Sequence, residues 1–202
     1  MGRFSHLRLI TYVDDMIITG SDDEEIVKLR RNLFTNFEMK DLERLKYFLG
    51  IDVLRSSKGI FISQRNYVLD FLAETGMVDY KIIDMPMQVN HKLKIVEGAT
   101  LADKERYQRL VEKLIYLSHT RLDIAYAVGI ISQFMHKPQE DHMEAAMMIV
   151  RYLKGAPGSR IIFKRNGHLK VEAYIDVDWA GNPNDRRSIV GYFTLVGGNL
   201  VT

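Results

Sequence analysis

The chain has 202 residues, of which 47% are hydrophobic and 27% are charged, and its formal net charge at pH 7 is +2. This composition argues against a disordered polypeptide, and the near balance of charge does not by itself indicate a nucleic-acid-binding protein. The absence of cysteine excludes disulfide bonds, cysteine-ligated zinc and thiol catalysis, and it agrees with an intracellular protein, cytoplasmic or nuclear. No apolar stretch approaches the roughly 18–20 residues that span a bilayer, so no membrane partner is expected.

The first predicted element is an apolar run over residues 7–20 that contains two adjacent aspartates, Asp14 and Asp15. Strand-forming residues on both sides place the pair at the turn of a β-hairpin. Two neighbouring carboxylates repel each other unless a cation lies between them, and such hard oxygen ligands suit divalent-metal chemistry on phosphates. Aspartate is also common in turns, so the pair alone more often indicates a solvated acidic turn than a metal site.

A helix is predicted over about residues 22–38. Ser21 is followed three residues later by Glu24, which is the pattern of a capping box. Apolar residues then recur at helical spacing, namely Ile26, Leu29, Leu33, Phe34 and Phe37. We expect this helix to pack on the sheet of the preceding hairpin.

A second hairpin is predicted from a strand over residues 47–54, a turn at 56–59 and a returning strand over 60–64. A short helix follows, ended by Gly76. One side of it carries Tyr67, Val68, Phe71 and Leu72. From about residue 78 to residue 100 the pattern weakens, which predicts a long irregular connection and a candidate boundary between subdomains.

Three helical segments are predicted next. The first carries Tyr107, Leu110, Val111, Leu114 and Ile115 at helical spacing. The second starts near Asp123 as its cap and carries Ile124, Ala127, Val128, Ile131 and Met135. The third follows Pro138, ends at Gly155 and carries Met143, Ala146, Met147, Val150 and Leu153.

From about Gly158 the periodicity becomes strand-like. Residues 161–164, a turn at Asn166–Gly167 and residues 169–177 are predicted to form a hairpin, and another strand is predicted over residues 189–196. These strands, after a helical block, indicate the start of a new α/β domain.

The string Tyr12-Val13-Asp14-Asp15 resembles the polymerase motif of reverse transcriptases, in which an aromatic and a variable residue precede two aspartates in a hairpin turn. The match continues in order and spacing through residues 42–51, 59–64, 114–121, 149–155, 174–181 and 185–188. Over nearly its whole length the chain is similar to the Pol polyprotein of copia-type LTR retrotransposons, and most of all to the plant copies.

This resemblance implies an α+β fold in three parts. Residues 1–80 would form a partial polymerase palm of β-hairpins packed on helices. Residues 81–157 would form a helical thumb or connection region. Residues 158–202 would hold the first strands of a ribonuclease H-like α/β domain.

The resemblance also implies site residues. Asp14 and Asp15 would be catalytic metal ligands for Mg²⁺ or Mn²⁺ in an RNA-directed DNA polymerase. Tyr12 would lie against the primer terminus. The hairpin from Tyr47 to Ile51, with Phe48, Leu49 and Gly50 between them, resembles the primer grip, although an apolar strand explains it equally well without the family match.

Further residues acquire roles by the same resemblance. His119 and Arg121 could contact phosphate, although a hydrogen bond within the fold explains His119 equally well. Asp176 corresponds to the first catalytic, metal-binding aspartate of ribonuclease H, and Asp178 on the same strand could share its face. The implied partners are an RNA or DNA primer–template, deoxynucleoside triphosphates and further segments of the polyprotein.

The chain departs from the family in its ligand set. Family polymerases add a catalytic aspartate from a strand well upstream, and ribonuclease H adds further carboxylates. Leu122 stands where the family usually has proline. Since catalysis tolerates misplaced ligands poorly, we expect a truncated copy that binds metal weakly and is inactive alone. The alternatives are a non-catalytic nucleic-acid-binding module and a decayed reading frame, whose exposed palm face would leave apolar surface and unpaired strand edges.

Overall fold

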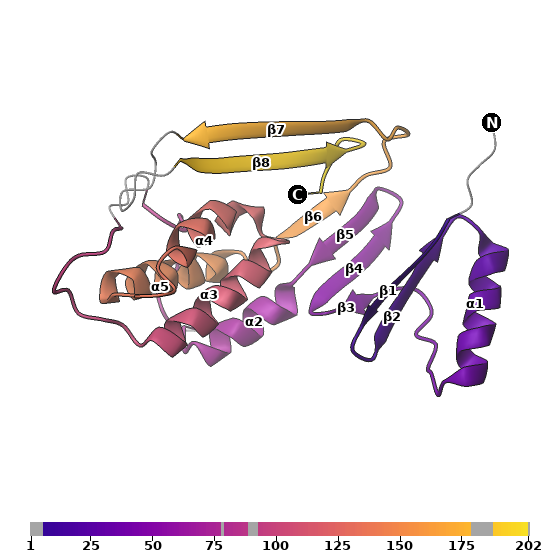
Figure 1. Ribbon diagram of the computed structural model, residues 1–202, viewed down its shortest axis with the longest axis horizontal. Coiled ribbons are helices and arrows are strands. Elements are labelled where there is room, and N and C mark those ends of the chain that lie inside the picture. The colour runs from indigo at the N-terminus through magenta and orange to yellow at the C-terminus, as the bar shows by residue number, and fades with distance from the viewer. Residues whose placement is uncertain (1–5, 78, 89–92, 179–187, 202) are drawn as a thin grey trace. The chain divides into compact units, whose positions relative to one another are not determined.

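The computed structural model describes residues 6–77, 79–88, 93–178 and 188–201. The chain divides into two compact units, residues 1–48 and 49–202 (Figure 1). Helices and strands are mixed within it, so the α+β class predicted from the sequence is confirmed. The predicted strings 179–181 and 185–187 lie outside the described residues. None of the helices in the described part of the chain has the length and apolar character that crossing a membrane requires.

The first unit is a β-hairpin and a helix, followed by a two-residue strand, β3 (Tyr47–Phe48). Strands β1 (Leu7–Tyr12) and β2 (Asp15–Gly20) pair antiparallel, and helix α1 (Asp23–Asn36) contacts β2, as predicted. The predicted capping box is wrong. The side chain of Asp22, one residue after Ser21, caps the helix by accepting a hydrogen bond from the Glu25 amide at 3.1 Å. Ser21 instead accepts a hydrogen bond from the His6 amide.

The second unit contains an antiparallel sheet with neighbouring strands β4 (Ile51–Ser56), β5 (Gly59–Ser63) and β6 (Arg160–Phe163). The predicted strand over residues 47–54 is wrong at one point, because a turn at Leu49 and Gly50 interrupts it. Both residues have positive φ, 49° and 77°, which an extended strand does not allow.

The predicted hairpin between residues 161–164 and 169–177 is also wrong. Strand β6 pairs with β5, while β7 (Val171–Asp178) pairs with β8 (Ile189–Val196), which continues to β9 (Asn199–Leu200). The β7–β8 ladder joins eight pairs of residues, twice as many as the four-residue β6 could offer to β7. The longer ladder satisfies more backbone hydrogen-bonding groups of β7, while β6 satisfies its own on β5.

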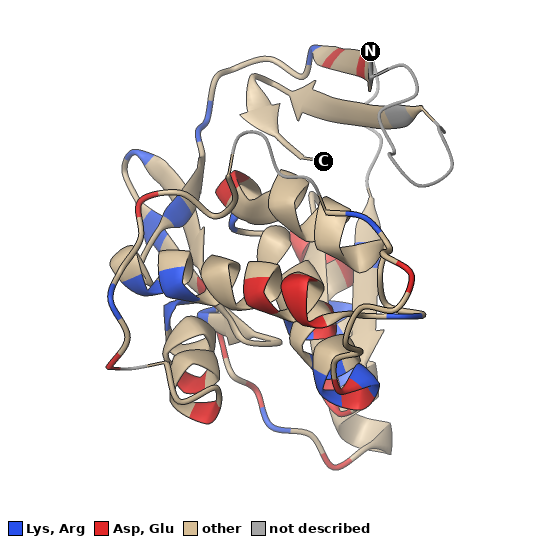
Figure 2. Ribbon diagram, turned by 90° about the vertical axis from the view of Figure 1, so that its left-hand side faces the viewer, with Lys and Arg blue, Asp and Glu red and all other residues tan. Residues whose placement is uncertain are grey.

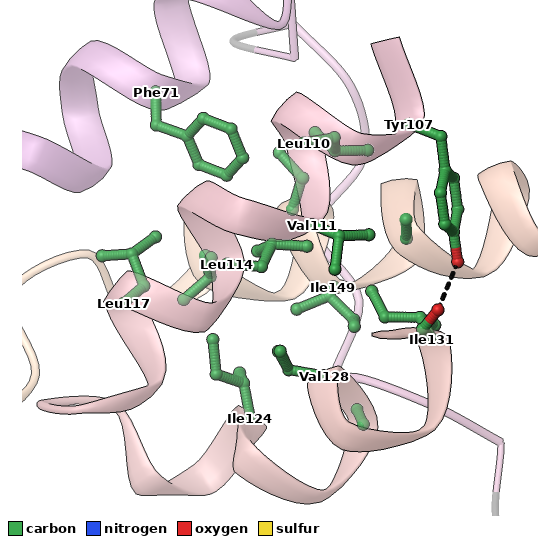
Figure 3. Close-up of a cluster of buried hydrophobic side chains, with 14 of the residues drawn as sticks. Phe71, Tyr107, Leu110, Val111, Leu114, Leu117, Ile124, Val128, Ile131 and Ile149 are labelled. Carbon is green, nitrogen blue, oxygen red and sulfur yellow. Dashed lines mark hydrogen bonds between the residues drawn. The ribbon is translucent and has the colours of Figure 1, made fainter. Parts of the chain in front are cut away.

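The core of the second unit lies among four helices (Figure 3): α2 (Arg65–Glu74), α3 (Lys104–Ser118), α4 (Ala125–Ser132) and α5 (Glu140–Gly155). The helical faces predicted from apolar spacing meet there, and the buried hydroxyl of Tyr107 donates a hydrogen bond to the Ile131 carbonyl at 2.7 Å. Each fully buried Leu, Ile or Val side chain contributes about 1.5–3 kcal/mol. Ile115 differs from the prediction because it is exposed and Leu117 is buried in the core instead.

The predicted cap at Asp123 is wrong as well. Asp123 lies inside a short 3₁₀ helix, η1 (Leu122–Ile124), and α4 begins after Ile124 without a side-chain cap. The carboxylate of Asp123 is directed to Arg121 and Tyr152.

The irregular connection predicted after α2 is confirmed, since the described residues of 79–103 form no helix and no ladder longer than one bridge. Part of this segment is fixed to the start of α5. The Gln139 side chain accepts a hydrogen bond from the Val96 amide and donates one to the Val96 carbonyl, at 3.0 and 2.6 Å. His142 adds a contact to the Lys94 carbonyl at 3.3 Å.

Candidate functional site

The two aspartates lie at the tip of the β1–β2 hairpin. Tyr12 pairs directly with Asp15, so Val13 and Asp14 form a two-residue loop, and Val13 has a φ of 49°. A positive φ at the first loop position is the pattern of a type II′ turn, whose twist matches that of the flanking strands. Valine is β-branched and rarely adopts this conformation, so the turn stores backbone strain next to the carboxylates.

The tip of this hairpin is open to solvent. Both carboxylates are exposed, and Tyr12 and Val13 keep 56% and 85% of their surface accessible. Residues directly opposite each other in an antiparallel pair project from the same face, so the Tyr12 ring and the Asp15 carboxylate share one face. A phosphate-bearing ligand could therefore reach an aromatic ring and a carboxylate together.

The donor chemistry of this turn fits a divalent metal in part. Mg²⁺ prefers octahedral oxygen coordination and is often held by one or two carboxylates plus substrate phosphates and water. Asp14 and Asp15 supply two such groups on adjacent residues. Within the ranges that the structure describes, no group of three or more His, Cys, Asp or Glu side chains is placed to hold a metal.

The predicted nucleic-acid-binding segment is a strand end followed by a turn. Tyr47 and Phe48 form β3, and Tyr47 is 58% exposed. Leu49 and Gly50, both with positive φ, form the two-residue turn before β4, in the manner of a type I′ turn. The hydroxyl of Tyr116 donates a hydrogen bond to the Leu49 carbonyl.

Asp176 lies in the middle of β7, opposite Gly191, and its side chain is exposed. Next to it on the ladder, the rings of Tyr174 and Phe193 stack with centroids 4.8 Å apart. Asp178 ends the strand. The structure therefore places Asp176 on the β7–β8–β9 sheet, in the second unit, whereas Asp14 and Asp15 belong to the first unit.

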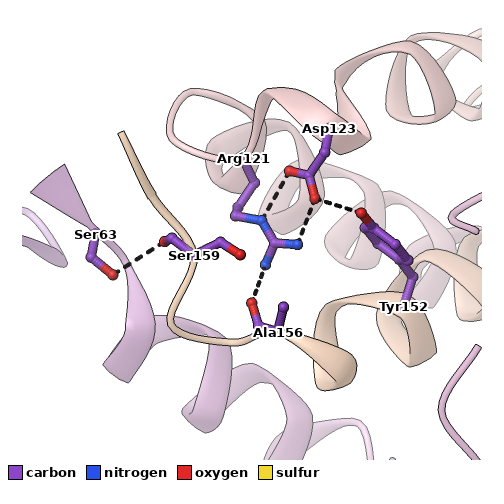
Figure 4. A network of polar contacts seen from close by, with 6 residues as sticks. All are labelled: Ser63, Arg121, Asp123, Tyr152, Ala156 and Ser159. Carbon is purple, nitrogen blue, oxygen red and sulfur yellow. Dashed lines mark hydrogen bonds and ion pairs between the residues drawn. The ribbon is translucent and has the colours of Figure 1, made fainter. Parts of the chain in front are cut away.

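Arg121, predicted as a possible phosphate contact, is not available for one. It is 2% exposed, and its guanidinium donates two hydrogen bonds to Asp123, at 2.9 and 2.7 Å, and one to the Ala156 carbonyl at 2.8 Å (Figure 4). The Tyr152 hydroxyl donates a further hydrogen bond to Asp123 at 2.8 Å. His119, by contrast, remains exposed at the end of α3.

The electrostatics of this network follow from its geometry. Burial alone would raise the pKa of the Asp123 carboxyl, but hydrogen bonds from Arg121 and Tyr152, together with the Arg121 charge, lower that pKa below its usual value. Burial and the bond to Asp123 raise the pKa of the Tyr152 hydroxyl. Sequence reasoning missed this network because its members come from two segments 29 to 35 residues apart, one at Arg121 and Asp123 and one at the end of α5. The only local signal was an Arg and an Asp two residues apart.

Positively and negatively charged residues are interspersed along the helices and loops of the ribbon (Figure 2). Helix α3 illustrates this, since its exposed Arg109 faces Glu105 at 3.8 Å, and Lys113 forms an ion pair with Glu74 of α2. These exposed pairs are weak and screened by salt. The candidate site residues named above are therefore distinguished by their positions in turns and strands, and not by a strongly charged surface around them.

Comparisons with known proteins place the chain among retrotransposon sequences. A family model described as reverse transcriptase (RNA-dependent DNA polymerase) matches residues 2–89. The chain is 43% identical over 189 residues to a retrovirus-related Pol polyprotein from transposon RE1 of Arabidopsis thaliana. The match covers 94% of this chain and 13% of that protein. The corresponding polyprotein from transposon TNT 1-94 of Nicotiana tabacum is 36% identical over 203 residues, with 95% of this chain and 15% of that protein covered.

A shorter relative matches over most of its own length. An uncharacterized mitochondrial protein of Arabidopsis thaliana is 36% identical over 194 residues, which cover 96% of this chain and 80% of that protein. By contrast, the chain spans only 13% of the length of the first two Pol polyproteins that it matches. No solved structure matches the chain.

Proposed function

Since the chain belongs to the reverse transcriptase family that includes the copia-type Pol polyproteins of plant retrotransposons, we propose that it is part of an RNA-directed DNA polymerase. Its family reaction would be template-directed DNA synthesis by nucleotidyl transfer. The observation that carries this proposal is the exposed pair Asp14–Asp15 at a strained two-residue turn, with the Tyr12 ring on the face of Asp15.

In this proposal Asp14 and Asp15 bind Mg²⁺ or Mn²⁺ through their carboxylate oxygens. When bound, the metals would supply activation of the attacking hydroxyl and neutralisation of the triphosphate charge. The two carboxylates belong to consecutive residues, Asp14 in the two-residue loop and Asp15 at the start of β2. Tyr12 presents its exposed ring to the terminal base of the primer, against which an aromatic side chain can stack.

The primer strand is proposed to run over Tyr47, Phe48 and the turn at Leu49–Gly50. Exposure of Tyr47 leaves its ring accessible to a nucleic-acid strand. The partners would be an RNA or DNA primer–template and deoxynucleoside triphosphates. The division into palm, thumb and ribonuclease H regions, over residues 1–80, 81–157 and 158–202, stays part of this proposal.

Asp176 is proposed as a metal-binding, catalytic aspartate of the ribonuclease H-like part. Support comes from its exposed position in the middle of a strand of an antiparallel sheet. Hydrolysis with two metals requires several carboxylates that converge on the ions. We therefore propose that further polypeptide segments complete both this site and the Asp14–Asp15 site, and that residues 1–202 tested alone do not synthesise DNA.

Metal binding and primer extension test this proposal together. Electron paramagnetic resonance of Mn²⁺ titrated into the 202-residue chain should detect weak binding that Asp14→Asn and Asp15→Asn each reduce. Asp70→Asn, which removes an exposed carboxylate of α2, is the matched control and should leave Mn²⁺ binding unchanged. Primer extension on RNA and DNA templates should give no product.

Two results would change the proposal. Robust synthesis that Asp14→Asn abolishes would overturn the proposed inactivity of the isolated chain. Binding of primer–template that depends on salt but not on Asp14, without any Mn²⁺ binding, would indicate a non-catalytic nucleic-acid-binding module instead.

A further inference from the structure

The turn at Leu49–Gly50 has a conformation that its own sequence does not explain. Leu49 has a φ of 49° and Gly50 a φ of 77°. Glycine adopts such values readily, but leucine rarely does because its Cβ approaches its own carbonyl oxygen. A leucine in this conformation persists where its surroundings fix it. Two contacts from the helices surround the Leu49–Gly50 turn.

The first contact is a hydrogen bond across the fold. Tyr116, on α3 and 67 positions further along the chain, donates its hydroxyl hydrogen to the carbonyl oxygen of Leu49. The orientation of this carbonyl is set by the backbone angles of Leu49 and Gly50. Because the Tyr116 ring is half-buried beside the core of α3, its hydroxyl is a fixed donor. Other orientations of the Leu49 carbonyl would lose this bond.

The second contact is aromatic. The ring of Tyr67, on α2, packs edge-on against the Tyr116 ring with centroids 5.2 Å apart. A Cβ placed on Gly50 would lie 3.3 Å from Cδ2 of Tyr67, and 3.8 Å from Cε1 of Tyr116. The rings of Tyr67 and Tyr116 therefore pack directly against Gly50. Together they contact the turn from two helices, and all four residues belong to the second unit.

We propose that Tyr116 and Tyr67 are positioning residues that hold the Leu49–Gly50 turn in the left-handed conformation in which it contacts the end of the primer strand. This inference rests on the proposed function, which gives the turn its nucleic-acid partner. It adds that helices α2 and α3, which carry Tyr67 and Tyr116, determine the conformation of the turn that contacts the primer. Neither tyrosine needs to touch the nucleic acid.

The test compares Tyr116→Phe with a matched variant of the same helix, Tyr107→Phe. Both remove a hydroxyl that donates to a backbone carbonyl, but the Tyr107 bond goes to Ile131 in the core. Two quantities are measured on the full chain: amide hydrogen exchange of residues 49–52, and the ratio of affinities for a duplex with a recessed 3′ end and a blunt duplex of the same length. Fluorescence anisotropy gives the affinities.

We expect the unmodified chain to prefer the recessed end. Tyr116→Phe should accelerate exchange at the turn and reduce that preference about two- to tenfold, the factor that one hydrogen bond of ordinary net strength represents. Tyr107→Phe should leave the exchange of residues 49–52 and the preference unchanged. Gly50→Ala, which meets the Tyr67 ring at a positive φ, should act in the same direction as Tyr116→Phe.

The results distinguish a failure of the positioning role of the tyrosines from a failure of the proposed primer contact. Unchanged exchange at the turn in Tyr116→Phe overturns the positioning role, whatever the affinities are. Faster exchange with an intact preference for the recessed end also overturns it, because the turn would then not be the primer contact. An unmodified chain without any such preference overturns the proposed primer contact itself, and the inference falls with it.

Discussion

The guanidinium of Arg121 makes its hydrogen bonds inside the protein, to Asp123 and to the Ala156 carbonyl. A buried cation is costly when it is unpaired, so the pair acts as a unit that joins the end of α3 to the end of α5. The Tyr152 ring lies 5.8 Å from the guanidinium carbon and adds a cation–π contact. At this position a charged side chain holds the helices together and is not a ligand for phosphate.

Asp123→Asn removes the carboxylate of this pair. The substitution leaves the buried Arg121 charge without its carboxylate and should lower the free energy of unfolding by about 2 kcal/mol, less than a fully buried pair would lose because Asp123 is partly exposed. Urea denaturation followed by circular dichroism measures it. Glu105→Gln, in the exposed pair with Arg109, is the control and should cost less than about 0.5 kcal/mol. Equal costs would refute the special role of the buried pair.

His142 is a second residue whose burial has consequences. It is fully buried, stacks on Phe134 with centroids 3.8 Å apart, and accepts a hydrogen bond from the Gln139 amide at Nδ1. Nε2 therefore carries the hydrogen that faces the Lys94 carbonyl, and the ring is neutral. Burial lowers the pKa of His142, although the Lys94 carbonyl and the Asp141 charge oppose this effect.

This arrangement predicts a loss of stability in mild acid. Because the pKa is lowered in the folded state, the unfolded chain takes up the proton first, near its ordinary pKa of about 6.5. The contribution of His142 is complete above that pH and falls as pH decreases, by at most about 1.4 kcal/mol for each pH unit. Urea denaturation at pH 7.5 and 5.5 should show a smaller acid loss in His142→Gln than in the unmodified chain. His119→Gln, at an exposed position, should leave the acid loss unchanged.

At the scale of elements, the β1–β2 hairpin combines a strained turn with two regular strands. Val13 provides the positive φ that the two-residue turn requires, and a residue without a Cβ would provide it at less cost. The six paired positions of the hairpin hold the turn despite this strain. Strain of this kind is common next to functional groups.

Val13→Gly should therefore stabilise the hairpin. The relief of backbone strain is partly offset by the greater conformational freedom of glycine in the unfolded chain, and the net gain should be about 1 kcal/mol. Val13→Ala removes the branching but keeps a Cβ at the same φ, so it is the matched control and should bring a smaller gain. Amide exchange of the β1 and β2 residues measures the local stability. Equal slowing of exchange in both variants would show that the branched side chain, and not a Cβ at positive φ, causes the strain.

The pairing of β6 with β5 is a second feature at this scale. It brings Ile161 opposite Ile62, and the Ser63 hydroxyl donates to the Ser159 carbonyl beside it. The chain has no cysteine, so engineered disulfides test the pairing without a background. Ile62→Cys/Ile161→Cys should oxidise to a disulfide. Ile162→Cys/Val171→Cys should stay reduced. The hairpin predicted from the sequence, with its turn at Asn166–Gly167, would bring these two positions together. A disulfide in this second variant but not in the first would support that predicted hairpin.

At the scale of the whole molecule, the β7–β8 sheet leaves apolar side chains open on both faces. Ile175 and Tyr192, which pair across the two strands, are 73% and 69% exposed. Exposed apolar patches and unpaired strand edges favour association with other chains. The core of the second unit lies among α2 to α5, and its described members include no residue of β7, β8 or β9.

We therefore predict that Ile175→Glu/Tyr192→Lys reduces association of the chain. The opposite charges face each other across the ladder, which keeps the strands paired while removing apolar surface. Light scattering over a range of concentrations should show a smaller mean mass than for the unmodified chain. The far-ultraviolet circular dichroism of the helices should not change. Association that persists in this variant would assign it to another surface.

The sequence by itself determined the features that depend on neighbours along the chain. Helical spacing identified the buried faces of α2, α3 and α5, for example Phe71 and Leu110, because amphipathic periodicity records which side of a helix avoids water. The alternation of strands and turn residues located the turns of the β1–β2 and β4–β5 hairpins, and the motif around Asp14 and Asp15 identified the family. These signals lie within a few residues of one another.

Only the tertiary structure decided the features that depend on contacts between distant segments. It buried Arg121 against Ala156, 35 positions away, and paired β6 with β5 rather than with β7. It also fixed Leu49 in a left-handed conformation through Tyr116. The physical reason is the same in each case. Burial and long-range hydrogen bonds outweigh local preference, and they exist only once the chain has folded.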